Sequence, residues 1–404
     1  MNDVFPLSSP AYADNPFPFW RHLRESQPVY WSEAYRFWVI TRYDDIVELA
    51  LRPDLLSSSI GAAGGMEGRE ADAGAADSVG FLPMIQHDPP EHTRLRSLLK
   101  RSFTSRRMAE LEPHIASIAG ELATAVRRRL AAGETVDLYE DFASPLPVTV
   151  IAELLGIPEE RRRQLRFWNR ATGVGSGEGF SEQQKIGANR QMSGMLEELI
   201  EERRVAPRED LISSLVQVAA EEGGDLRASE LLGFCKLLWI AGNETTTNLI
   251  TNGALILQDR PDLVAALAAD KSRVPLFVEE ALRFEGPVNG LFRQASGDFE
   301  FRGQTLRAGD AVWLLWASGN RDALHYDQPD EFVLERNPRD HLAFGHGIHF
   351  CLGAHLARLE ARVAFEKLVE LLPECRCQPA RGKRLPTPIL RGWLELPAVP
   401  AAGA

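Results

Sequence analysis

The sequence has few cysteines, no excess of basic residues and no long hydrophobic run. Its four cysteines among 404 residues are too few for a disulfide framework. Lys and Arg total 45 against 57 Asp and Glu, and the resulting net charge of −12 argues against a nucleic-acid-binding surface. The most apolar stretch starts at Leu231, contains Lys236 and is well short of the ~20 residues that a bilayer span requires.

The N-terminal stretch of residues 1–20 contains acids and prolines but lacks an apolar signal core. It predicts neither a signal peptide nor a membrane anchor, so we expect a cytoplasmic protein without membrane contact. A composition of 44% hydrophobic and 25% charged residues is that of a globular enzyme that can bury a sizeable core.

Helical periodicity dominates the chain up to about residue 290, and its longest predicted helix runs from about Ser229 to Gln258. Residues 28–43 alternate apolar and polar side chains around a short turn, which predicts a β-hairpin before a helix that begins near Asp44. Short strand-like runs follow Leu291, and a hairpin is predicted near the C-terminal end.

The glycine-rich stretch at residues 60–79 is too poor in large apolar groups to pack by itself and predicts a mobile loop. A second glycine-rich stretch, at residues 173–179, separates two predicted helices, and the two stretches together predict an entrance that opens and closes. No internal repeat and no polar linker divides the chain. We therefore predict a single domain over residues 1–404 that is mainly α with a small β-rich region.

Cys351 is the one cysteine whose surroundings indicate chemistry. Cys235 lies among apolar residues and is expected to be a core side chain, and Cys375 and Cys377 are expected to be free thiols. The segment Phe344-Gly-His-Gly-Ile-His-Phe-Cys351-Leu-Gly-Ala-His opens a long predicted helix. A cysteine near a helix N-terminus is stabilised as a thiolate, the form that ligates a metal ion.

The glycines of the cysteine segment, Gly345, Gly347 and Gly353, would let the backbone approach a large flat ligand closely. A zinc site is the alternative, because nitrogen and sulfur ligands occur within ten residues. The spacing of these ligands matches no common zinc module; they are His346, His349, Cys351 and His355.

The centre of the longest predicted helix interrupts its apolar pattern. Ala241-Gly-Asn-Glu-Thr-Thr246 places a glycine, an acid and hydroxyls inside a buried helix, where polar groups are costly unless they have partners. A polar helix face with hydroxyls bonded back to the helix is the alternative to a functional role.

These motifs resemble those of soluble bacterial cytochromes P450, and the resemblance extends along the whole chain. Phe344 to Gly353 meets every fixed position of the haem-binding signature F-G-x-G-x-H-x-C-x-G, and Ala241 to Thr245 is similar to the distal-helix motif A-G-x-[DE]-T. Glu280-Ala-Leu-Arg283 and the later Arg336 match the family's E-x-x-R pair and its third arginine.

The resemblance implies the P450 fold, in which a long distal helix and a proximal cysteine loop enclose a haem. Cys351 would ligate the iron, Thr245 would hydrogen-bond the oxygen bound there, and Glu244 would help relay protons. Glu280, Arg283 and Arg336 would lock the segment that carries the cysteine. Further haem-binding positions are implied at His92, Arg96, Ala241, Gly242, Arg293, Phe344, Gly345, His349 and Gly353.

A haem carries two propionates, which require donors or cations at one edge of a buried ring. Asp88-Pro-Pro-Glu-His92 predicts a helix start with Asp88 as its cap, and it places His92 and Arg96 one turn apart on one face. Together with Arg293 and His349, these residues match the propionate-binding positions of the family. Solvated surface charge is the alternative for His92 and Arg96.

The implied activity is insertion of one oxygen atom from O2 into an apolar small molecule, with haem b as cofactor. The sequence has no flavin or iron–sulfur motif, so electrons from NAD(P)H must arrive through a ferredoxin or flavodoxin and its reductase. A basic docking patch is a candidate for that partner, formed by Lys100, Arg101, Arg106, Arg107 and Arg358, and solvated surface is the equal alternative for these residues. The alternatives are a peroxide-driven peroxygenase and a catalytically silent haem-fold protein that binds a partner, and we expect a monomer.

The predicted substrate pocket is lined by the glycine-rich stretch up to Gln86, the region near Gly173 and a set of apolar residues. That set favours a hydrophobic substrate without identifying it. Its members are Ile240, Ala241, Val288, Leu291, Phe292 and Ile389.

Overall fold

The computed structural model describes residues 6–7, 9–59, 84–100, 103, 105–173, 179–221 and 226–401. The glycine-rich stretch predicted as a loop at residues 60–79 lies outside the described residues, as do residues 174–178 of the second stretch. Within these described ranges, no helix combines the length and apolarity needed to cross a membrane.

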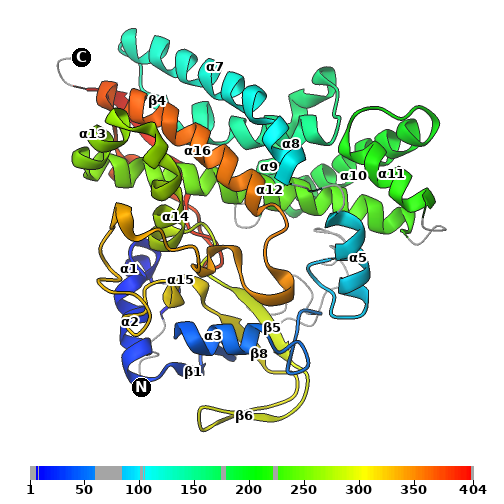
Figure 1. Ribbon diagram of the computed structural model, residues 1–404, viewed down its shortest axis with the longest axis vertical. Coiled ribbons are helices and arrows are strands. Elements are labelled where there is room, and N and C mark those ends of the chain that lie inside the picture. Colours follow the sequence, from blue (N-terminus) through cyan, green and yellow to red (C-terminus); the bar gives the residue numbers. More distant parts are fainter. Residues whose placement is uncertain are drawn as a thin grey trace.

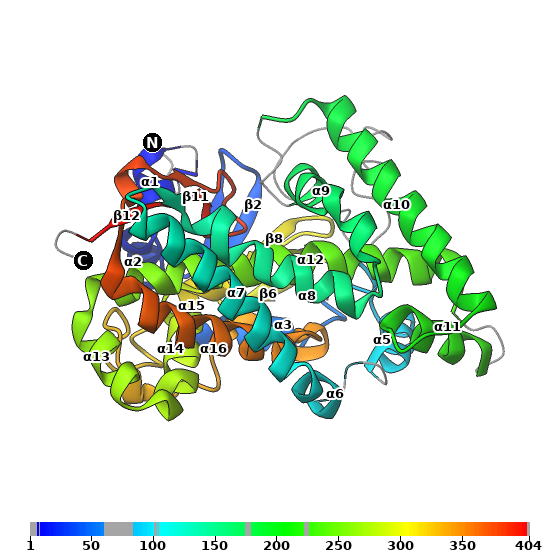
Figure 2. The ribbon, with the colours of Figure 1, turned by 90° about the horizontal axis from the view of Figure 1, so that it is seen from above.

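A 32-residue helix, α12 (Ala228–Asp259), runs through the centre of the molecule (Figures 1 and 2). It confirms the long helix predicted over residues 229–258. The helices that pack against it most extensively include α8 (Pro145–Leu154), α10 (Glu182–Val205), α14 (Val274–Glu285) and α16 (Ala354–Leu371).

The contact between α12 and α16 is close because Gly253 has no side chain. A β-carbon at this position would lie 2.3 Å from Cζ of Phe365, a side chain of α16 that is fully buried. The Phe365 ring of α16 therefore packs directly against the backbone of α12 at Gly253. This close contact fixes the position of α16, and of the segment before it, relative to α12.

The remaining helices complete a mainly helical molecule. Figure 1 shows β1, β5, β6 and β8 in the part of the molecule near the N-terminus, whereas β4 lies near the C-terminal end. The helix predicted near Asp44 is found as α3. The helices not yet described are α1 (Pro10–Asp14), α2 (Phe17–Ser26), α3 (Tyr43–Ala50), α5 (Glu91–Lys100), α6 (Ser105–Glu110), α7 (Glu112–Ala131), α9 (Leu165–Thr172), α11 (Leu211–Glu221), α13 (Pro261–Ala269) and α15 (Trp316–Gly319).

The largest sheet joins residues 29–57 to residues 291–314. Its strand order is β1 (Val29–Ser32), β2 (Phe37–Ile40), β8 (Ala311–Leu314), β5 (Leu291–Ala295) and β3 (Leu56–Ser57). The predicted N-terminal hairpin is β1–β2, which pair antiparallel, and β2 pairs parallel with β8. The sheet therefore fixes β5, a strand with predicted site residues, against the N-terminal hairpin.

Three smaller sheets complete the β-rich part. The C-terminal hairpin predicted from the sequence is the antiparallel pair β10–β11. Together with the helices, these sheets confirm a mainly α fold with a small β-rich region. The smaller sheets are β4 (Val136–Asp137) with β12 (Pro397–Pro400) and β9 (Cys375–Cys377), β10 (Lys383–Arg384) with β11 (Trp393–Glu395), and β6 (Phe299–Phe301) with β7 (Gln304–Leu306).

Candidate active site

The cysteine segment is held in a defined loop before α16. The backbone N–H of Cys351 donates to the carbonyl oxygen of Phe344 at 2.9 Å, which closes the loop. Gly345 and Gly347 have φ angles of 71° and 72°, a conformation that glycine adopts without strain. A β-carbon on Gly347 would also lie 2.6 Å from the carbonyl oxygen of Ala50, so this position excludes any side chain.

Cys351 lies three residues before the first residue of α16, which confirms its predicted position near a helix N-terminus. Burial nevertheless raises the pKa of its thiol, while the N–H of Gly353 and the charges of Arg96 and Arg358 oppose this rise. A bound metal cation would favour the thiolate form of Cys351 further.

The zinc alternative finds no support in the described residues, which include all four candidate ligands. No group of three or more His, Cys, Asp or Glu side chains in that part of the chain is arranged to hold a metal ion. Cys235 is fully buried, and Cys375 and Cys377 are buried free thiols, as predicted.

The centre of α12 is open on one side. Ala241 is exposed and Gly242 and Thr245 are half-exposed, although the neighbouring Asn243 and Glu244 are buried. An exposed position in the middle of a central helix requires open space beside that helix. This space lies at the segment where the sequence predicted oxygen handling.

The Thr245 hydroxyl donates to the carbonyl oxygen of Ala241 at 2.8 Å, and α12 is continuous through this turn. This is the hydroxyl-to-helix bond considered above as the alternative. It does not exclude a role for Thr245, because a hydroxyl that donates its proton still has lone pairs that accept hydrogen bonds.

Glu244 is buried on α12 beside Tyr139, and both residues lie away from bulk solvent. Burial raises the pKa of the Tyr139 phenol, and the nearby Glu244 charge raises it further. Tyr139 therefore remains a neutral phenol at this carboxylate.

Four basic residues from three segments meet at the cysteine segment and are defined here as the basic cluster. They are His92 and Arg96 of α5, Arg293 of β5 and His349 of the cysteine segment itself. The rings of His92 and His349 have centroids 4.3 Å apart. Arg96 donates to the carbonyl oxygen of Phe350 at 2.5 Å. The structure thus brings together all four residues that the sequence predicted for propionate binding.

Among the described residues, Asp88 is the carboxylate that faces the basic cluster. Burial lowers the pKa of Arg293 to about 10, and Asp88 is the acidic group that opposes this change. Burial lowers the pKa of His349 to about 3, and the positive charges of Arg293, His92 and Arg96 contribute smaller decreases. Both ring nitrogens of His92 are buried without a hydrogen-bond partner. A site with this donor set fits a ligand that carries two carboxylates, as a haem does.

Asp88 does not cap α5, contrary to the sequence-based expectation. Its carboxylate accepts from the backbone N–H of Ser58 at 2.9 Å and from the Ser57 hydroxyl. Ser58 in turn contacts Nε2 of His349 through its hydroxyl at 2.9 Å. Asp88 therefore ties the start of α5 to the segment at β3, a contact that local sequence does not reveal.

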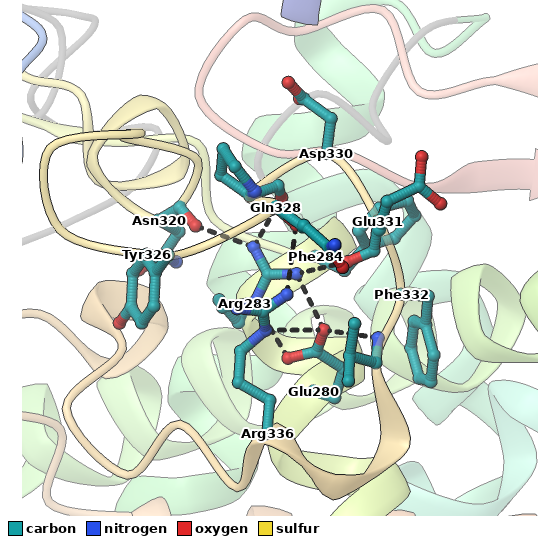
Figure 3. Close-up of polar contacts among 12 residues, drawn as sticks. Glu280, Arg283, Phe284, Asn320, Tyr326, Gln328, Asp330, Glu331, Phe332 and Arg336 are labelled. Carbon is teal, nitrogen blue, oxygen red and sulfur yellow. Dashed lines mark hydrogen bonds and ion pairs between the residues drawn. The ribbon is translucent and has the colours of Figure 1, made fainter.

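Glu280, Arg283 and Arg336 meet as predicted from the E-x-x-R pattern (Figure 3). Arg283 donates to both oxygens of the buried Glu280 carboxylate at 2.7 and 2.8 Å, and Arg336 donates to one of them at 3.2 Å. The carboxylate also accepts from the Val333 N–H at 2.9 Å. These contacts join α14 to the irregular segment that precedes the cysteine segment.

The predicted pocket residues divide into two groups. Val288 pairs with Leu390 in an isolated bridge beside Ile389, so the two predicted pocket segments lie together. Phe292 differs, because its ring stacks on Trp313 with centroids 5.4 Å apart and packs edge-on against Phe37. Since strand side chains alternate, Phe292 lies on the face of β5 opposite Leu291 and Arg293, and we do not retain it as a pocket residue.

The predicted docking patch is only partly described. Lys100 is exposed, whereas Arg101 and the side chains of Arg106 and Arg107 lie outside the described residues. Arg358 is not a free cation, because it forms a two-pronged ion pair with Glu279 at 2.7 and 2.9 Å. Glu279 was not predicted from the sequence, although its position directly before Glu280 is a signal that could have drawn attention to it.

Comparison with known proteins gives consistent matches. The Cytochrome P450 family model matches residues 181–391. Cytochrome P450 107B1 of Saccharopolyspora erythraea is 40% identical over 373 residues, which cover 90% of this chain and 89% of that protein. Vitamin D(3) 25-hydroxylase of Pseudonocardia autotrophica is 41% identical over 371 residues, covering 91% and 89% of the two chains.

Solved structures agree with these relatives. Cytochrome P450 CYP109Q5 from Chondromyces apiculatus superposes with a TM-score of 0.86 at 36% identity, covering 98% of each chain. CYP109E1 from Bacillus megaterium, in complex with testosterone, gives a TM-score of 0.83 at 34% identity and covers 98% of this chain and all of that one. The fold, the cysteine segment and these matches together establish that the chain belongs to the cytochrome P450 family of haem-thiolate monooxygenases.

Proposed function

We propose that this protein inserts one atom of O2 into an apolar small molecule, by hydroxylation or epoxidation, with haem b held by Cys351. The observation that carries the proposal is the basic cluster beside the cysteine segment. Its buried His92 has no hydrogen-bond partner, and Asp88 is the acidic group that faces it. The two propionates of a haem would satisfy these donors.

The bound haem would supply the iron that activates dioxygen, and the Cys351 sulfur would supply electron density to it. The basic cluster would bind the propionates. Residues around the loop and the open side of α12 would border the ring; they are Phe344, Gly345, Gly353, Ala241 and Gly242.

Thr245 and Glu244 are the proposed proton-handling residues. Because the Thr245 proton is donated to Ala241, its oxygen is available to accept a hydrogen bond on the open side of α12. The buried Glu244 carboxylate, one residue earlier, would receive protons and pass them toward Thr245.

A hydrophobic substrate is supported by the residues retained for the pocket, which are Ile240, Ala241, Val288, Leu291 and Ile389. All five have apolar side chains, and Leu291 shares its strand face with Arg293 of the basic cluster. Two similar proteins are associated with hydrophobic compounds: the vitamin D(3) 25-hydroxylase above carries one in its name, and CYP267B1 has a solved structure in complex with myristic acid.

The proposed electron donor is a ferredoxin or flavodoxin that is reduced by NAD(P)H through a reductase. We also propose a monomer, a single domain over residues 1–404 and a cytoplasmic location. The free state of all four cysteines is compatible with that reducing compartment.

The test is turnover of an apolar compound library by the haem-loaded protein under two conditions. With ferredoxin, reductase and NADPH we expect oxygenated product, and with hydrogen peroxide alone we expect little. Product from peroxide only would instead indicate a peroxygenase. No product under either condition, despite substrate-induced changes in the haem spectrum, would indicate the silent haem-fold alternative.

A further inference from the structure

We propose that Glu279 and Arg358 are positioning residues that hold Phe344 in place and thereby fix the backbone of the proposed ligand, Cys351. The inference rests on the proposed ligation of haem iron by Cys351. It also gives Arg358 a role inside the protein in place of the partner-docking role considered from the sequence.

The Glu279–Arg358 pair has the geometry of a rigid clamp between α14 and α16. Arg358 donates through Nε and Nη2 to the two carboxylate oxygens at 2.7 and 2.9 Å. Such two-pronged pairs fix the orientation of the guanidinium plane as well as its position. Glu279 is 9% exposed, so water competes little for these bonds.

His341 adds a third member to the clamp. Its Nδ1 accepts from the backbone N–H of Ala343 at 3.2 Å, so the ring proton of a neutral His341 resides on Nε2. That nitrogen lies 3.3 Å from a carboxylate oxygen of Glu279. Glu279 therefore holds α16 through Arg358 and lies beside His341, three residues before the cysteine segment begins.

Phe344 connects this clamp to the cysteine. The Arg358 guanidinium lies 4.5 Å from the centroid of the Phe344 ring, a cation–π contact. The carbonyl oxygen of the same Phe344 accepts the Cys351 N–H at 2.9 Å. A shift of the Phe344 ring would therefore move the backbone acceptor on which the position of Cys351 depends.

Two adjacent carboxylates of α14 thus hold two different segments. Because successive helix residues point about 100° apart, Glu280 faces Arg283 and Arg336, whereas Glu279 faces Arg358 and His341. Glu280 fixes the irregular segment upstream, and Glu279 fixes the cysteine segment itself. The two roles can be separated by mutation.

Arg362 provides a matched control for Arg358. It lies one turn further along α16, lines the same groove of about 300 Å³ and is also ion-paired, to Glu112 and Glu366 at 2.7 Å each. The side chains of Arg358 and Arg362 are 29% and 23% exposed. Only Arg358 lies over Phe344, so substitution to glutamine removes the same charge at both sites but disturbs the clamp at one.

The experiment compares haem-loaded wild type, Arg358→Gln, Arg362→Gln and Arg358→Lys. Each protein is reduced and treated with carbon monoxide, and loss of the red-shifted thiolate band is followed in mild denaturant. We expect R358Q to lose the band about tenfold faster than R362Q, the scale of one lost charged hydrogen bond. R358K keeps the positive charge but cannot form the two-pronged pair with Glu279, so its rate of band loss should lie between those of R358Q and wild type.

The reduction potential gives a second readout that a merely structural role would not shift. We expect a more negative haem potential in R358Q, because a nearby cation favours the reduced iron, and little change in R362Q. Should R358Q fail to retain haem, Glu279→Gln carries the test, since it keeps the arginine but weakens its anchor and should lose the thiolate band faster than wild type.

Equal band-loss rates and equal potentials in R358Q and R362Q would overturn the inference and leave the proposed function intact. An E279Q protein that behaves like wild type would also overturn it. A wild-type protein without the red-shifted band would overturn the proposed ligation and this inference together.

Discussion

Charged residues around the cysteine segment follow two contrasting arrangements. The carboxylates of α14, Glu279 and Glu280, are paired with arginines and backbone donors. In the basic cluster, His92 has no hydrogen-bond partner and Arg293 donates to the neighbouring carbonyl oxygen of Phe292. The contrast indicates that the first arrangement holds the protein together, whereas the second is built for an anionic ligand.

The largest expected effect comes from Glu280→Gln, which removes one of the two ion-paired carboxylates of α14. The variant leaves the buried Arg283 and the partly buried Arg336 without their shared carboxylate, so we expect unfolding free energy to fall by about 3 to 5 kcal/mol. Denaturant unfolding of the haem-loaded protein measures this loss. Glu335→Gln is the control, because Glu335 is exposed and pairs with Arg273 at the surface, where less than about 1 kcal/mol is expected. Equal losses in the two variants would contradict the assigned role of Glu280.

A pH-dependent loss is expected for Glu279. Burial alone would raise its pKa, but hydrogen bonds from His341 and Arg358 outweigh burial and lower the pKa to about 2 from 4.5. Below pH 4.5 the unfolded chain therefore binds a proton that the folded protein does not. The contribution, about 3 kcal/mol at most, is complete above pH 4.5 and disappears as pH falls toward 2.

Unfolding of wild type and Glu279→Gln over this acid range measures that contribution. Their difference in unfolding free energy should shrink steadily as the pH falls below about 4.5. A difference that stays constant with pH would show that Glu279 is not held as a charged partner of Arg358.

Thr245→Ala tests the open side of α12. The variant should keep the thiolate spectrum but direct most electrons to hydrogen peroxide, with product per NADPH reduced about tenfold or more. Thr251→Ala is the control, since Thr251 makes the same kind of bond to a helix carbonyl but is fully buried. Unchanged product yield in the Thr245 variant would remove it from the proton path.

The smallest effect on the stability of the fold is expected for His92→Phe in the basic cluster. Because His92 makes no protein hydrogen bond, the substitution should barely change the stability of the chain. Haem loss to an acceptor protein should nevertheless become about tenfold faster, as one donor to a propionate is removed. A variant that retains haem as wild type does would argue against the proposed propionate site.

Sequence analysis was most successful where the signal is local. The helix over residues 229–258 and the loop around Cys351 follow from contiguous patterns, and the structure finds the helix and places the loop before another helix. The pairing of Glu280 with Arg283 is also local, one helical turn apart.

The remaining features depend on distant partners. Asp88 looked like a helix cap because its binding partners, Ser57 and Ser58, lie 30 or more residues away. Phe292 seemed a pocket residue until the pairing of β5 with β8 defined which face it occupies. Glu279 and Arg358 are separated by 79 positions, and no local pattern predicts which of several arginines a carboxylate will meet.

The central claim is that Cys351 ligates the haem iron, and the carbon monoxide difference spectrum of the reduced protein tests it most directly. We predict a red-shifted Soret band in the wild type that is lost in Cys351→His, even where the variant retains haem. A wild-type protein without that band, or a Cys351→His variant that keeps it, would contradict the claim.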